Sequence, residues 1–186
     1  QGRRLNKVLA NTLTCNSIYL RQIMQQYAAG KSDDLAYRLA RRNAHNADAA
    51  LSTTLANMLM EPGHFRKEAD VGFRFLVLSH TLLSYLSGLG AHRETQLPAD
   101  VREHLIDGAG VSLAASIDEI AQGLTNKLPI AIQSDAEEAL ANELEQMPDE
   151  IDEGQRLVQT QLALICRQLG PLRTLAAHLI KDTSET

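Results

Sequence analysis

The sequence is poor in the residues that build β-sheets and disulfide frameworks. It has no tryptophan, four tyrosines, three phenylalanines and two cysteines among 186 residues. No segment alternates apolar and polar residues over the length of a strand. Two isolated cysteines, Cys15 and Cys166, do not make a disulfide framework and favour a reducing compartment. The 44% of hydrophobic residues, mostly Ala and Leu, therefore predicts one all-helical core.

The sequence also lacks the motifs of common enzymes. It has no glycine-rich phosphate loop, and Gly88-Leu89-Gly90 lacks the third glycine and the preceding strand of a dinucleotide site. No two of the six histidines are three or four residues apart, and there is no Cys-x-x-Cys motif. No candidate nucleophile has a general base at a sequence spacing that would bring the two side chains together. We therefore expect no enzymatic activity, no catalytic residue, no metal and no cofactor.

Charge is unevenly distributed along a chain whose formal net charge is −5. Residues 1–45 hold eight Lys or Arg against two Asp or Glu, whereas residues 94–155 hold two against fifteen. A nucleic-acid-binding module has a basic face without so large an acidic counterpart, so no nucleic-acid partner is expected. The basic start, Arg3, Arg4 and Lys7, suits the cytoplasmic side of a membrane, and an ordinary solvated helix start explains it equally well.

Apolar residues at three- and four-residue spacing predict four long helices, near residues 4–29, 33–60, 66–91 and 152–180. Gly30 and the run Glu61-Pro62-Gly63 end the first two. Because the connections are short, neighbouring helices are expected to be antiparallel. The predicted fold class is all-α, an up-and-down bundle of four long helices with shorter additional helices, in a single domain over residues 1–186.

The shorter helices are expected between residues 98 and 148, with a break at Gly108-Ala109-Gly110 and a capping box from Ser134 to Glu137. The helix at 66–91 is apolar on several faces, so we expect it to be the most buried. Its expected core residues are Phe75, Leu76, Leu78, Leu82, Leu83 and Leu86. The helix at 33–60 is expected to turn one stripe inward, formed by Leu35, Leu39, Ala44, Ala47, Leu51, Leu55, Met58 and Leu59.

One group of polar residues interrupts the apolar pattern of the second and third helices. It consists of Arg38, Arg42, His45, Asp48, Arg74 and His80. Arginine next to a core needs acceptors, because an unpaired buried charge costs several kcal/mol. We expect an interhelical network in which most charges are paired. Three interpretations stay open: a structural network that fixes helix register, a binding site for a small carboxylate or phosphate, and surface ion pairs.

Two segments that contain these residues, 37–48 (YRLARRNAHNAD) and 73–93 (FRFLVLSHTLLSYLSGLGAHR), carry a family resemblance. They resemble the C-terminal cytoplasmic region of the YccS/YhfK branch of the FUSC (fusaric acid resistance-like) bacterial inner-membrane proteins. The resemblance is densest over residues 19–93. It implies a C-terminal fragment of a larger membrane protein, lying on the cytoplasmic side of the bacterial inner membrane, with its N-terminus next to that membrane.

The resemblance also implies a role in the assembly or regulation of a transporter that exports small organic or aromatic acids. Its partners would be the rest of the parent membrane protein, further copies in a homo-oligomer, and a small anionic ligand. Separation from the membrane part is expected to expose Leu5, Val8 and Leu9. The alternative function is an effector-binding sensor domain with a small-molecule pocket in the bundle. A pocket of a few hundred Å³ that is lined by apolar residues and has convergent Arg or His would favour it.

Overall fold

The computed structural model describes residues 2–29, 34–61 and 66–184. Within these ranges it is helical and has no β-strand, which confirms the all-α fold class. The elements are α1 (Gly2–Ala29), α2 (Asp34–Met60), α3 (Arg66–Ala91), α4 (Ala99–Arg102), the π-helical segment η1 (Glu103–Gly110), α5 (Val111–Asn126), α6 (Asp135–Glu145) and α7 (Glu153–Ser184). The predicted stops at Gly30, Pro62 and Gly63 lie outside the described residues, as does the side chain of Arg3.

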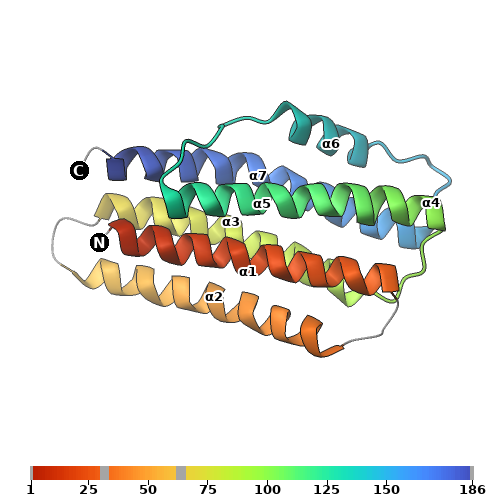
Figure 1. Cartoon of the computed structure of the whole chain (residues 1–186), viewed down its shortest axis with the longest axis horizontal. Helices are drawn as coiled ribbons and strands as arrows, with labels where there is room; N and C mark the ends of the chain where they lie inside the picture. Colours follow the sequence, from red (N-terminus) through yellow and green to blue (C-terminus); the bar gives the residue numbers. More distant parts are fainter. Residues whose placement is uncertain (1, 30–33, 62–65, 185–186) are drawn as a thin grey trace.

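The four predicted long helices correspond to α1, α2, α3 and α7, and successive helices run in opposite directions along the molecule (Figure 1). α1 lies between α2 and α5, and α7 packs against α3, α5 and α6. α1 begins and α7 ends at the same end of the bundle, whereas the loop from α6 to α7 lies at the other end (Figure 1). None of the described helices has a stretch long and apolar enough to span a lipid bilayer.

The most buried helix is α1, not α3 as predicted. It packs against α2, α3, η1, α5 and α7, and its apolar residues Leu5, Leu9 and Leu13 are almost completely buried. In α3, Val77 is 63% exposed, because one side of that helix has no neighbour. Exposed apolar side chains are common on protein surfaces, so an apolar run alone does not mark the central helix. The expectation that Leu5 and Leu9 are exposed is wrong, because both face the helices that surround α1, and Val8 is half-buried.

α2 turns inward the predicted stripe from Ala44 to Met58, but both ends of that stripe differ from the prediction. Leu35, Leu39 and Leu59 are each more than half exposed. The buried row consists of Tyr37, Ala40, Ala44, Ala47, Leu51, Leu55 and Met58, at heptad-like spacing. Small alanines on this row let α2 pack closely on its neighbours. The inward face is therefore rotated away from the leucines at the start of α2, and the arginines near them turn toward solvent.

The predicted break at residues 108–110 does not occur. α4, η1 and α5 follow one another without interruption, so residues 99–126 form a further long helical stretch that packs along α1. Gly110 is buried, and a side chain there would collide with the sulfur of Met24 in α1. The glycine thus allows close helix packing within a π-helical segment, instead of ending a helix.

Candidate functional site

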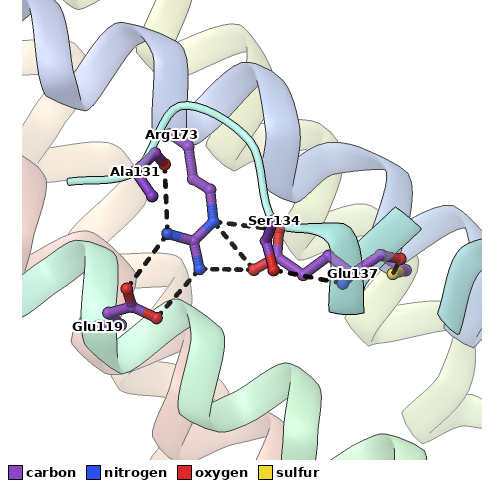
Figure 2. Close-up of polar contacts among 6 residues, drawn as sticks. Glu119, Ala131, Ser134, Glu137 and Arg173 are labelled. Carbon is purple, nitrogen blue, oxygen red and sulfur yellow. Dashed lines mark hydrogen bonds and ion pairs between the residues drawn. The ribbon is translucent and has the colours of Figure 1, made fainter. Parts of the chain in front are cut away.

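Arg173 of α7 is the only charged residue among the described ones that is buried. Its side chain is 3% exposed. The Nε atom donates to both carboxylate oxygens of Glu137, at 2.9 and 3.0 Å, and Nη2 donates to Glu137 at 2.6 Å. Nη2 and Nη1 also donate to the two oxygens of Glu119, at 3.1 and 3.4 Å (Figure 2). One guanidinium therefore joins α5, α6 and α7.

The connection between α5 and α6 takes part in the same cluster. Nη1 of Arg173 donates to the backbone carbonyl of Ala131 at 3.5 Å. Ser134 caps α6: its hydroxyl oxygen accepts from the backbone N–H of Glu137 at 3.3 Å, as the capping box predicts (Figure 2). This cap fixes the first turn of α6, so the Glu137 carboxylate is held where Arg173 reaches it. We call Arg173, Glu119, Glu137 and Ser134 the Arg173 cluster.

The electrostatics of the cluster favour a structural role. Burial lowers the pKa of the Arg173 guanidinium, but hydrogen bonds to Glu137 and Glu119 more than offset this, and the net pKa lies above its usual range. Two carboxylates compensate one guanidinium, whose Nε, Nη1 and Nη2 atoms are all engaged. The Arg173 cluster therefore offers no free positive charge to a ligand.

Cys166 lies beside the cluster and is held as a neutral thiol. It is buried, and its S–H donates to the backbone carbonyl of Glu137 at 3.3 Å. Burial, with the nearby charge of Glu137, raises the pKa of the thiol to about 11. Because the thiolate is the reactive form, Cys166 is poorly suited to nucleophilic chemistry at neutral pH.

A groove of about 450 Å³ runs between α6 and α7 next to the cluster. Its lining includes Glu138, Arg167 and Cys166. Arg167 is already paired, with Glu138 at 2.9 Å and with Glu145 through its Nε at 2.6 Å. Since carboxylates outnumber cations here, the groove does not suit an anion. Within the described ranges there is also no group of three or more His, Cys, Asp or Glu residues that could hold a metal ion.

The predicted group on the second and third helices is only partly assembled. Asp48 of α2 and His80 of α3 meet, with Oδ2 and Nδ1 2.9 Å apart. Arg38, Arg42, His45 and Arg74 lie on the exposed surface of α2 and α3. Since the buried row of α2 runs through Tyr37 and Ala44, these side chains need no buried acceptors. The structure thus joins one pair across the two helices and leaves the other predicted positions facing solvent.

The sequence patterns do not single out Arg173, Glu119 or Glu137 as a cluster, although one signal is present. Arg173 falls within the apolar stripe of its helix, between the buried residues Leu169 and Ala176. Arg173 is four residues after Leu169 and three before Ala176, so it shares their buried face of the helix. A charge on a buried face needs a partner. The partners are 36 and 54 residues away in sequence, so spacing alone cannot identify them.

Comparison with known proteins shows which family the chain is related to. The chain is 33% identical over its whole length to the inner membrane protein YccS of Escherichia coli (strain K12), and covers 25% of that protein. This chain belongs to the YccS family. It is also 50% identical over 91 residues to an uncharacterized protein of Haemophilus influenzae, and 33% identical over 87 residues to the uncharacterized protein ORF2 of Neisseria gonorrhoeae.

The chain spans a quarter or less of each of these relatives, covering 13% of the Haemophilus influenzae protein and 21% of the Neisseria gonorrhoeae one. No protein-family model matches it, and no solved structure does. Relationship to an inner membrane protein indicates a domain associated with a membrane protein.

Proposed function

We propose that this chain is a non-enzymatic cytoplasmic domain of a FUSC-type inner-membrane protein, placed at its C-terminal end, and that it supports the assembly or regulation of a transporter. The observation that carries the proposal is the match of the whole chain to about a quarter of YccS. The transported substrates would be small organic or aromatic acids. The domain would contact the rest of the parent protein and further copies of itself.

The charge distribution supports the proposed orientation. Arg4 and Lys7 are exposed near the start of α1, at one end of the bundle. The acidic loop after α6, which includes Asp149 and Glu150, lies at the opposite end (Figure 1). Anionic lipids of a cytoplasmic leaflet attract basic side chains and repel acidic ones. This arrangement suits a domain whose α1 approaches the membrane with its basic end.

The orientation can be tested in the full-length parent protein. Green fluorescent protein and alkaline phosphatase are fused after Thr186 in two otherwise identical proteins. The fluorescent fusion is expected to fluoresce and the phosphatase fusion to be inactive, because alkaline phosphatase needs the oxidising periplasm for its disulfides. An active phosphatase together with a dark fluorescent fusion would overturn the cytoplasmic assignment.

The supporting role is tested by removing the domain from the parent protein. A deletion of residues 1–186 is compared with the Arg42→Gln variant of the intact protein, since Arg42 is exposed. We expect the deletion, and not the substitution, to reduce export of a radiolabelled aromatic acid from whole cells, or to change the oligomer seen by cross-linking. If both the export and the cross-linked oligomer are unchanged by the deletion, the proposed role is wrong.

A further inference from the structure

A second pocket of about 450 Å³ lies at the end of the bundle where α1 ends and α4 begins (Figure 1). It is formed by the last turn of α1, the segment between α3 and α4, and α4 itself. Its lining residues include Tyr27, Arg93, Thr95, Leu97 and Arg102. We call it the Arg93–Arg102 pocket. It shares no residue with the Arg173 cluster.

Arg93 is fixed in position by neutral groups. Its Nη1 donates to the backbone carbonyl of Gly90 at 3.0 Å, and its guanidinium carbon lies 4.3 Å from the centre of the Tyr37 ring. The Nε atom is buried and has no hydrogen-bond partner within the described part of the chain. Stacking on an aromatic face orients a guanidinium without neutralising it. Arg93 lines the pocket and has no carboxylate partner among the described residues, so it brings a positive charge to the pocket.

Arg102, which α4 contributes to the pocket, is half-buried and forms no ion pair with any described residue. Outside this pocket, the one described arginine that is more buried, Arg173, has two carboxylates, and the more exposed Arg21 reaches Asp118. A partly desolvated cation without a counter-charge is unfavourable, and an anion between Arg93 and Arg102 would relieve that cost.

The remaining lining defines what kind of anion fits. The Tyr27 hydroxyl already donates to the Leu89 carbonyl at 2.7 Å, so Tyr27 contributes mainly its ring. Thr95 and Gln96 supply neutral hydrogen-bonding groups, and the exposed Glu94 is the one carboxylate of the lining. Two guanidiniums against one carboxylate leave a net positive charge. Residues with polar side chains outnumber apolar ones among the described residues of the lining, which favours a hydrophilic molecule over an aromatic one.

We propose that the Arg93–Arg102 pocket binds a small hydrophilic anion, whose carboxylate or phosphate oxygens are held between the two guanidiniums. Both oxyanions accept the paired hydrogen bonds that arginine offers. The bound molecule would tie the end of α1 to the start of α4. The site goes beyond the proposed function, because it requires neither a membrane nor transport and is a property of this chain alone.

The test uses the 186-residue chain, labelled with ¹⁵N, and two probes, succinate and inorganic phosphate, with neutral succinamide as the matched control. We expect at least one anion to shift the backbone amide signals of residues 93–97 and 99–102 in a saturable way, at millimolar concentration. Succinamide is expected to leave them unchanged. The amides around the groove between α6 and α7 should not respond, because its arginine is already paired.

Substitutions then assign the binding to the two arginines. Arg102→Gln is expected to weaken binding about tenfold or more, the loss typical of a charge-assisted hydrogen bond. Arg42→Gln removes an exposed arginine and is the matched control. Arg93→Lys keeps the charge but loses the planar fork, so an intermediate weakening is expected. The proposal is overturned if neither anion gives saturable shifts, if succinamide shifts the same signals equally, or if Arg102→Gln binds as well as the parent chain.

Discussion

The corner formed by α5, α6 and α7 and the outer face of α2 both contain arginine and a carboxylate, but they pair them differently. At the corner, buried Arg173 is joined to two carboxylates from two other helices. On α2, Arg42 and His45 face solvent, and Asp48 reaches across to His80 of α3. Burial decides the difference, because removing a charge from water requires partners, whereas water itself stabilises an exposed charge. The Arg173 cluster should therefore contribute to stability, and the α2 charges should not.

The largest effect is expected for Arg173→Met. This change leaves the carboxylate of Glu137, which is 11% exposed, without its cation. Breaking a buried pair in this way costs about 3–5 kcal/mol. The free energy of unfolding from urea titration, followed by circular dichroism, measures the loss. Arg42→Met is the control and should stay within about 0.5 kcal/mol of the parent. If both variants lost the same free energy of unfolding, the corner and the outer face of α2 would not differ in their contribution to stability.

Cys166 should make the corner sensitive to alkaline pH. Its pKa is raised from 9.0 to about 11, so the folded state favours the neutral thiol. The corresponding stability is complete below pH 9 and is lost as the pH rises through about 11. Two pKa units correspond to about 3 kcal/mol. Unfolding titrations at pH 8 and above pH 11 should show this loss of stability in the parent and a smaller loss in Cys166→Ala. The comparison separates the contribution of the thiol from that of the buried tyrosines. A loss of the same size in both would contradict the assignment.

The two carboxylates of the Arg173 cluster should differ from each other. Glu137→Gln is expected to cost about 1–3 kcal/mol, because a largely buried acceptor of a charged donor is replaced. Glu119 is 60% exposed, so Glu119→Gln should cost less than about 1 kcal/mol. The same urea titration provides both values. A greater loss for the Glu119 variant would show that the exposed partner, not the buried one, holds the corner.

The smallest effect is expected on α2. Asp48→Asn removes the one interhelical charge pair of the predicted group, but the His80 side chain is 65% exposed. Such a pair contributes about 1 kcal/mol or less. The melting temperature of Asp48→Asn should therefore lie close to that of the parent, and His80→Gln should behave alike. If either variant were destabilised as strongly as Arg173→Met, the outer face would be a structural network after all.

The sequence predicts the helices of this chain better than their packing. The cap at Ser134 follows from local capping chemistry, which acts over a few residues. Gly110 is different. From its sequence neighbours this glycine suggests a helix break, but in the fold it permits close contact with Met24, which is 86 residues away in sequence. Periodicity predicts the inward row of α2 from Ala44 to Met58, but the inward side at the start of that helix depends on neighbours that periodicity does not reveal.

The candidate sites were harder to predict than the fold. The arginines and histidine repeated along α2 suggest a polar network, but their positions on the helix place them on its exposed side. Arg173 is a single charge in an apolar stripe, and its partners come from distant segments. Arg93 and Arg102 meet at a pocket only because α3 and α4 are joined by a turn at the end of the bundle. In each case a long-range contact, absent from the sequence pattern, makes the site.

The central claim, that the Arg173 cluster holds the corner while the α2 charges do not hold the fold, is tested most directly by two double-mutant cycles. One combines Arg173→Met with Glu137→Gln, and the other combines Asp48→Asn with His80→Gln. We expect a coupling free energy of about 2 kcal/mol or more for the first pair and less than about 0.5 kcal/mol for the second. Coupling energies of equal size, or a larger one for Asp48 and His80, would contradict the account.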